Sequence, residues 1–84
     1  MPVAVRVLYF GGLRDDVGLT EESLMLPPHI QTVGDLRDHL AGRRPAYGER
    51  RGSVRIARNE TFASDDERLS NGDVIALIPP VAGG

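Results

Sequence analysis

The sequence predicts an α+β fold in which about four to five short strands pack on one main helix. Residues 3–10 alternate in the manner of a strand, residues 32–42 repeat apolar side chains at helical spacing, and residues 74–78 form an apolar run after a strong turn signal. With 84 residues, 40% of them hydrophobic, the chain suits one domain with a modest core. We expect that domain over residues 1–78 and an extended tail over residues 79–84.

The first strand is expected at Val3–Phe10. Its odd-numbered side chains are all apolar and should face the core, whereas Arg6 indicates that the other face reaches solvent. Leu8 and Phe10 lie on that outer face. Large apolar side chains on an outer face usually mean that another surface covers them.

A short helical turn and a second strand should follow. Gly11-Gly12 breaks the first strand, and Leu13–Val17 is expected to form one helical turn that Gly18 ends. The second strand is expected at Ser23–Leu26, with its two leucines facing inward. It should end at Pro27-Pro28, because proline cannot donate a hydrogen bond to a sheet.

The main helix is expected to begin after Thr32. Threonine can cap a helix, Asp35 stands three residues later as a short version of the capping-box acid, and apolar residues recur at i, i+3 and i+7 from Val33. Gly42 is expected to end the helix. This pattern buries one narrow stripe, so we expect one face of the helix to pack on the sheet.

An arginine-rich segment, Arg43–Gly52, is expected to be a polar loop. It could steer an acidic partner or a phosphate, or it could simply be solvated. A third strand is then expected at Val54–Ala57. Asn59-Glu60 should turn the chain into a short strand around Thr61-Phe62, after which Leu69 is expected to anchor the following loop in the core.

The last strand is expected at Val74–Ile78, released by the turn Asn71-Gly72-Asp73. Both faces of this strand are apolar, so it is either fully buried or docked against a partner. The first strand has the same excess on its outer face, which suggests a protein–protein surface unless a helix or loop of this chain covers it. The predicted docking residues are Leu8, Phe10, Ala76 and Ile78.

The composition excludes several classes of function. A formal net charge of −2 and a pI near 5.6 give no general attraction to nucleic acid or to an anionic membrane. The absence of cysteine removes disulfides, thiolate nucleophiles and cysteine metal sites, and two histidines form no recognisable metal spacing. We therefore expect no bound cofactor, no metal and no self-contained active site. Without a leader or a long apolar segment, a cytoplasmic location is the default.

The C-terminal segment is the strongest functional signal. It reads Pro79-Pro80-Val81-Ala82-Gly83-Gly84. The prolines favour an extended path in a defined direction, whereas glycine has no Cβ and can enter a channel that is too narrow for other residues. A frayed, inert tail is the alternative.

The order of elements and the Gly-Gly ending resemble the β-grasp fold of ubiquitin-like proteins, which has a mixed sheet. More narrowly, Leu69–Asp73, the strand after it and the Pro-Pro-Val-Ala-Gly-Gly ending resemble the molybdopterin synthase small subunit family, the sulfur carriers of that enzyme. The resemblance covers nearly the whole chain. Gly11-Gly12 and Val74 depart from the family pattern, and neither departure touches the tail.

The resemblance implies a chemistry for the terminal carboxylate. An E1-like adenylating enzyme would use ATP and Mg²⁺ to convert the carboxylate of Gly84 to an acyl-adenylate, and a persulfide donor would then supply the sulfur of a thiocarboxylate. The tail would enter the large subunit of a heterotetrameric synthase. Its position would be set by Pro79, Pro80, Val81 and Ala82, and Gly83, which has no side chain, would keep it narrow. There the sulfur would pass to a cyclic pterin phosphate precursor to form the dithiolene. General acids and bases would belong to the large subunit.

Three other functions are compatible with the sequence. One is a sulfur carrier for thiamin or cysteine synthesis, which would share the fold and the Gly-Gly ending. Another is a ubiquitin-like modifier whose Gly84 becomes joined to lysines of other proteins. The third is an interaction module with an inert tail.

Overall fold

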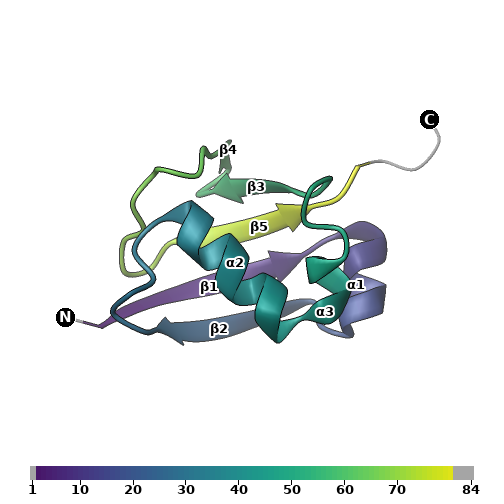
Figure 1. Ribbon diagram of the computed structural model, residues 1–84, viewed down its shortest axis with the longest axis horizontal. Helices are drawn as coiled ribbons and strands as arrows, with labels where there is room; N and C mark the ends of the chain where they lie inside the picture. Colours follow the sequence, from purple (N-terminus) through teal and green to yellow (C-terminus); the bar gives the residue numbers. More distant parts are fainter. Residues whose placement is uncertain (1, 81–84) are drawn as a thin grey trace.

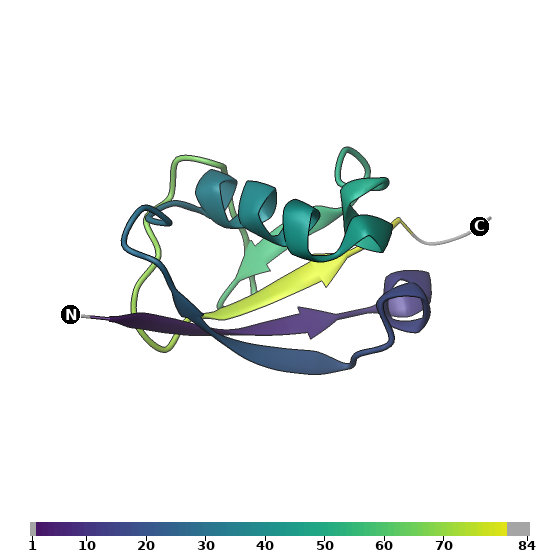
Figure 2. The ribbon, with the colours of Figure 1, turned by 60° about the horizontal axis from the view of Figure 1, so that its bottom comes forward.

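The computed structural model describes residues 2–80, and the structural statements below concern this part of the chain. It contains a five-stranded sheet with helices along one face, which confirms the predicted α+β fold (Figure 1). In chain order the elements are β1 (Val3–Tyr9), α1 (Gly11–Val17), β2 (Glu21–Leu26), α2 (Val33–Arg43), α3 (Pro45–Gly48), β3 (Arg55–Arg58), β4 (Thr61–Phe62) and β5 (Val74–Ile78). Figure 2 shows α2 and α3 on one side of the sheet and α1 at one end of it; the other side carries no helix of the described chain.

The sheet is mixed, and its strands lie in the order β2-β1-β5-β3-β4. β1 pairs antiparallel with β2 and parallel with β5, while β3 pairs antiparallel with both β5 and β4. The first and last strands of the chain are therefore neighbours at the centre of the sheet. Because they run in the same direction, they end at the same edge, where the chain continues into α1 and into Pro79.

The alternation predicted for the first strand is confirmed. The odd-numbered side chains between Val5 and Tyr9 are buried, and Arg6 is exposed on the other face. β2 begins at Glu21, two residues earlier than predicted, because its antiparallel register with β1 continues to the pair Leu8 and Glu21. The core contains side chains from both layers: Val5, Val7, Tyr9, Leu13, Leu24, Leu26, Ile30, Val33, Leu36, Leu40, Tyr47, Val54, Ile56, Ile75 and Leu77.

The predicted capping box of the main helix is present. The Thr32 hydroxyl accepts a hydrogen bond from the Asp35 N–H at 3.1 Å, and the Asp35 carboxylate accepts one from the Thr32 N–H at 3.1 Å. Two donors that a helix would otherwise leave unpaired are thereby satisfied. The predicted apolar stripe of Val33, Leu36 and Leu40 is fully buried.

The prediction that Gly42 ends this helix is wrong. α2 continues to Arg43, and Arg44 leaves the helical conformation with φ −124° and ψ 90°. The residue after Arg44 is Pro45, and proline disfavours the helical conformation of the residue before it. The stop signal is therefore the proline rather than the glycine.

The helical turn after the first strand begins earlier than predicted. α1 spans Gly11–Val17, so the glycine pair forms its first turn instead of preceding it. Leu13 is fully buried and anchors this helix to the core. The predicted stop at Gly18 is confirmed: Gly18 is left-handed, and its N–H donates to the Arg14 carbonyl.

The sequence suggested that Arg43–Gly52 is a polar loop, but the structure shows otherwise. It contains the short helix α3, and the Tyr47 side chain is fully buried under it. Burial raises the pKa of Tyr47 to about 12. Gly48 permits this packing, since a Cβ at that position would lie 2.7 Å from the Ala41 carbonyl oxygen of α2.

The turn before β5 is present as predicted and attaches the end of the chain to its beginning. The Asn71 side chain accepts a hydrogen bond from the Ala4 N–H at 2.9 Å, and the Gly72 N–H donates to the Ala4 carbonyl at 2.8 Å. The Arg6 N–H donates to the Asp73 carbonyl at 3.0 Å. These bonds fix where β5 starts relative to β1.

Both shorter strands are present, although β3 lies one residue later than the expected Val54–Ala57. β3 and β4 are joined at Asn59-Glu60, where both residues have positive φ, and β4 is the expected pair Thr61-Phe62. Leu69, expected to anchor the following loop, is partly buried against the core. The backbone of that loop is also joined to the start of α2, where the Gly34 N–H donates to the Asp65 carbonyl at 2.9 Å.

Asp73 is the one buried charged side chain among the described residues. Its carboxylate accepts hydrogen bonds from Arg58 at 2.7 Å, from Asn59 at 2.9 Å and from the Ser70 N–H at 2.7 Å. Burial opposes ionisation, but these donors outweigh it and hold the pKa of Asp73 below its ordinary value. The ionised carboxylate therefore joins β3, the turn after β3 and the start of β5.

We expect Asp73→Asn to lower the free energy of unfolding by about 1–3 kcal/mol at neutral pH, because buried donors lose a charged acceptor. Since the folded pKa lies below the unfolded value of about 3.9, the contribution is complete above that value and is lost as the pH falls through the folded pKa. Urea unfolding between neutral pH and pH about 3 should show a smaller acid-dependent loss in Asp73→Asn than in the original protein. Asp15→Asn, on the exposed surface of α1, is the control. Equal acid sensitivity of all three proteins would contradict this role.

We expect Gly48→Ala to destabilise the fold by about 1–3 kcal/mol, because the new methyl group would collide with the backbone of α2. Gly42→Ala is a matched control, since a Cβ at this position on α2 would meet no heavy atom within 4 Å. There the gain in helix propensity should stabilise by about 0.5–1 kcal/mol. Urea unfolding of both variants measures the difference, and a loss of stability in Gly42→Ala alone would refute the packing argument.

Candidate functional site

The four predicted docking residues lie together on the open face of the sheet. The parallel register of β1 and β5 sets Leu8 opposite Ala76, so the outward side chains of the two strands form adjacent rows. Phe10 is 44% exposed just beyond the end of β1, and Ile78 is half-buried at the end of β5. A hollow of about 260 Å³ lies on this face, lined by Leu8, Phe10, Ala57, Glu60, Phe62, Val74, Ala76 and Ile78. We call this set the open-face hollow.

Phe62 is the main member of this hollow that the docking prediction missed. It is 49% exposed, and β4 places it opposite Ala57, which in turn lies opposite Ala76 in β5. Residues opposite one another share a face, so Phe62 belongs to the same outward row. Two residues of strand give no periodic pattern, and only the sheet order shows where this ring lies.

Charged side chains border the open-face hollow. On one side the Arg55 guanidinium lies over the Phe62 ring, 3.5 Å from its centre, as in a cation–π interaction. On the other side Arg6 pairs with Glu21 at 2.7 Å. An apolar centre with a charged border is typical of protein–protein docking surfaces.

The apolar surface continues to the point where the tail leaves the domain. A second hollow, of about 580 Å³, is lined by Phe10, Gly11, Gly12, Arg50, Ser53, Ile78, Pro79 and Pro80. We call it the tail-root hollow. Phe10 and Ile78 line both hollows, so the two are adjacent.

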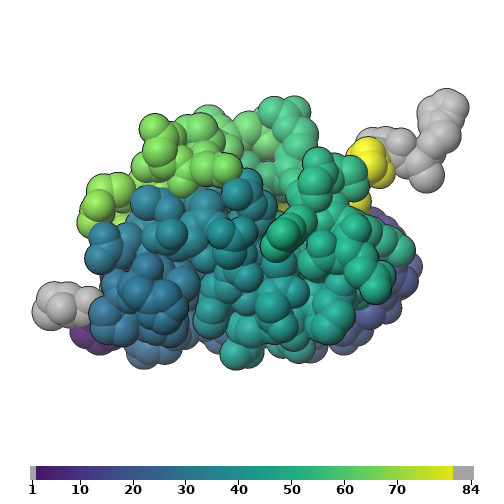
Figure 3. All heavy atoms as spheres, in the orientation of Figure 1, coloured from purple at the N-terminus to yellow at the C-terminus, as the bar shows by residue number. Residues whose placement is uncertain are grey.

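The tail itself is described only at its root. β5 ends at Ile78, Pro79 is half-buried and Pro80 is exposed. In Figure 3 the yellow residues at the end of the described chain project at one end of the molecule, beyond the surface formed by α2 and α3. Val81, Ala82, Gly83 and Gly84 lie outside the described residues. The division at residue 78 and the extended path of residues 79–84 stay predictions.

Three of the four arginines of the segment 43–52, namely Arg43, Arg44 and Arg50, pair with acidic side chains of this chain. Arg44 donates twice to Glu22, at 2.7 and 3.1 Å, and the buried Tyr9 hydroxyl donates to the same carboxylate. Burial opposes ionisation of Glu22, but these donors hold its pKa below the ordinary value. Arg50 forms an ion pair with Asp16 of α1. These contacts attach α3 and the loop after it to β2 and α1.

The described residues contain no group of three histidine, cysteine or acidic side chains placed to hold a metal ion. Within residues 2–80, no helix is long and apolar enough to cross a membrane.

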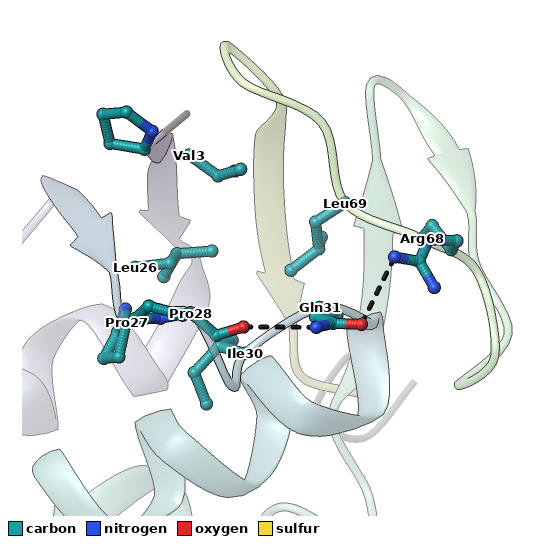
Figure 4. Close-up of a pocket in the computed structure, with 9 residues that line it drawn as sticks. Val3, Leu26, Pro27, Pro28, Ile30, Gln31, Arg68 and Leu69 are labelled. Atoms are coloured by element: carbon teal, nitrogen blue, oxygen red, sulfur yellow. Dashed lines mark hydrogen bonds between the residues drawn. The ribbon is translucent and has the colours of Figure 1, made fainter.

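Another hollow, of about 520 Å³, lies at the opposite end of β1 from the tail (Figure 4). Its polar groups pair with one another: the Gln31 side chain donates to the Pro28 carbonyl and accepts from Arg68, both at 3.3 Å. None of the predicted site residues lines it. The open-face and tail-root hollows, which the predicted site residues do line, are therefore the candidate functional surface.

A mixed sheet with a central parallel pair, one main helix across one face and a C-terminal strand that leads directly into a tail define a ubiquitin-like β-grasp protein. The ThiS family model matches residues 7–84. Over 82 residues the chain is 38% identical to the molybdopterin synthase sulfur carrier subunit of Escherichia coli, a match that covers 95% of this chain and 99% of the relative. It is 34% identical to the subunit of the same name from Mycobacterium tuberculosis, and this match covers 98% of this chain and 99% of the relative. The chain therefore belongs to the ThiS family, together with these molybdopterin synthase sulfur carrier subunits.

Solved structures agree with this assignment. Small archaeal modifier protein 1 (SAMP1) from Haloferax volcanii has a TM-score of 0.83 and 30% identity, over 96% of this chain and 99% of its own. Subunit 1 and subunit 2 of molybdopterin-converting factor from Helicobacter pylori were solved as a protein–protein complex. The matching chain in it has a TM-score of 0.68 and 29% identity, over 98% of this chain and 100% of its own.

Proposed function

We propose that this protein is the sulfur carrier of a molybdopterin synthase and that it carries the sulfur as a thiocarboxylate on Gly84. The observation that carries the proposal is that an exposed apolar hollow adjoins the root of a Pro-Pro-Val-Ala-Gly-Gly tail. A docked partner that covers the open face would receive the tail at a fixed place. Membership of the ThiS family and similarity to named sulfur carrier subunits support it.

The terminal carboxylate needs activation before it can accept sulfur. Its negative charge repels nucleophiles, and oxide is a very poor leaving group. In the proposed cycle an E1-like enzyme uses ATP and Mg²⁺ to attach AMP to a carboxylate oxygen and releases pyrophosphate. A persulfide donor then attacks the carbonyl carbon, AMP leaves, and reductive cleavage of the S–S bond by a thiol leaves the thiocarboxylate. This chain binds no cofactor itself, and we place the cycle in the cytoplasm, where ATP is available.

The second half of the proposed cycle takes place in the large subunit. The thiocarboxylate enters that subunit as the nucleophile, and two such transfers to a cyclic pterin phosphate precursor build the dithiolene. The large subunit supplies the general acids and bases, so the carrier contributes a positioned nucleophile to a shared active site. The complex of the two Helicobacter pylori subunits supports a partner of this kind.

The tail composition suits insertion into a narrow channel. Pro79 and Pro80 have few backbone conformations, so little entropy is lost when the tail root becomes fixed. Gly83 and Gly84 have no side chain, which allows the closest approach of the backbone to the substrate. We expect the acyl chemistry to depend on both properties.

A second candidate function is protein modification, in which Gly84 forms an isopeptide bond with lysines of other proteins. The structural similarity to SAMP1, which is named as a modifier protein, supports this second function. It predicts a ladder of higher-mass conjugates that carry Gly84 in isopeptide linkage. A carrier for thiamin or cysteine synthesis would instead be purified with a different acceptor enzyme, and identification of the bound partner separates it from the main proposal.

We expect Phe10→Asp or Ile78→Asp to raise the Kd for the large subunit by about 30-fold or more, because each variant buries a carboxylate in an apolar contact. Isothermal titration calorimetry with the purified large subunit measures this, and circular dichroism checks that the fold is intact. Met25→Asp is the matched control: Met25 is 68% exposed on β2, opposite Ala4 and outside the open-face hollow. Unchanged affinity in both hollow variants would contradict docking through this face.

We expect deletion of Gly84, or one added alanine after it, to abolish sulfur transfer, because the reactive carboxylate would be displaced by one residue, about 3.5 Å. The protein purified from its native host should gain the mass of one sulfur in exchange for one oxygen, and fragmentation should place that change on Gly84. Both variants should still bind the large subunit, since the open-face hollow is unchanged. Full transfer activity with either variant would refute the terminal-carboxylate mechanism.

A further inference from the structure

Gly11 and Pro79 are in close contact although they lie near opposite ends of the chain. Gly11 has φ +55°, and a Cβ at this position would lie 3.2 Å from the Cγ atom of Pro79. Few real Cβ atoms approach a neighbour so closely. The proline ring therefore lies against the glycine backbone. A side chain at position 11 would have to move this ring.

This contact is a consequence of the parallel pairing of β1 and β5. Tyr9 is opposite Leu77, so the two strands end side by side, and the next residues turn into α1 and into the tail. The first residue of α1 and the first residue after β5 thus meet at the edge of the sheet. The place where the tail begins is also the place where α1 begins.

The α1 side of the contact is held firmly. Leu13 is fully buried, the Gly18 N–H closes the far end of the helix, and Asp16 pairs with Arg50. By contrast, Pro80 is exposed and Pro79 is half-buried beside the tail-root hollow. A methyl group at position 11 would therefore displace the proline ring rather than the helix.

We propose that Gly11 is a positioning residue that sets the direction in which the tail leaves the domain. The proline ring has a fixed φ, so a shift of the ring turns the whole segment that follows it. Five residues separate Pro79 from the end of the sequence and reach about 17 Å when extended, so a small rotation at the root moves the terminal group by several times the shift of the ring. This inference rests on the proposed function only for its catalytic consequence, because the direction of the tail can be measured without any partner.

The test compares Gly11→Ala with Gly18→Ala. Both glycines have positive φ and lie at the two ends of α1, so alanine is strained at either position. Only position 11 would bring the new methyl group against the tail, since a Cβ at position 18 meets nothing within 4 Å. The pair therefore separates the contact with Pro79 from backbone strain. Pro79→Gly is a third variant, which removes the ring while Gly11 stays unchanged.

The first measurement is the set of residual dipolar couplings of the amides of residues 81–84 relative to those of the β-sheet. We expect Gly11→Ala to change the tail couplings, Gly18→Ala to leave them as in the original protein, and Pro79→Gly to bring them close to zero. Sheet couplings that match the original show that each variant is folded. Tail couplings in folded Gly11→Ala that are the same as in the original protein would overturn the proposal.

The second measurement is sulfur transfer in a single turnover, with thiocarboxylated carrier and saturating large subunit. We expect Gly11→Ala to lower the rate constant by about tenfold or more, since small misplacements of a reacting group have large effects, while Kd changes by less than about threefold. Gly18→Ala should transfer at the original rate. If the original protein transfers no sulfur, the proposed function fails, whereas the dipolar couplings still decide the role of Gly11. An original rate in a Gly11→Ala protein with altered couplings would overturn the catalytic part of the proposal.

Discussion

The parallel pairing of β1 and β5 is the constraint on which the rest of the structure depends. It sets Leu8 opposite Ala76, which creates the apolar rows of the open face, and it sets Tyr9 opposite Leu77, which brings the tail beside α1. A parallel pair cannot be closed by a tight turn, so the chain between the two strands must cross over the sheet. The main helix lies in that crossover and covers one face, which leaves the other face for a partner.

The register of this pair is fixed by polar contacts at its far end as well as by the buried apolar side chains. Asn71 and Gly72 bond to the backbone of Ala4, and the buried carboxylate of Asp73 joins the start of β5 to Arg58 and to the neighbouring turn. A slip by one residue would turn the inward side chains of β5 to the outside and break these bonds together. The turn thus controls the geometry of the functional surface at the other end of the strands.

The sequence predicted the features that depend on local periodicity and left out those that depend on contacts between distant segments. Alternation located β1, an apolar run after a turn signal located β5, and the capping pair Thr32 and Asp35 located the start of α2. The end of α2 was wrong because the effect of Pro45 outweighed that of a glycine. The buried Tyr47 could not be recognised inside an arginine-rich segment. Of the candidate site, the docking residues on β1 and β5 were predicted from their outward rows, whereas Phe62 required the sheet order.

The separation of a rigid docking surface from a narrow tail suits a carrier that must meet more than one enzyme. In the proposed cycle, both the activating enzyme and the large subunit receive the same terminal group. The two enzymes cannot hold that group at the same time, so the carrier has to leave one before it serves the other. A small apolar hollow with a charged border gives specificity without the large buried area of a permanent interface. The carrier therefore gains most from precise placement of its tail root, where β1, β5 and α1 meet.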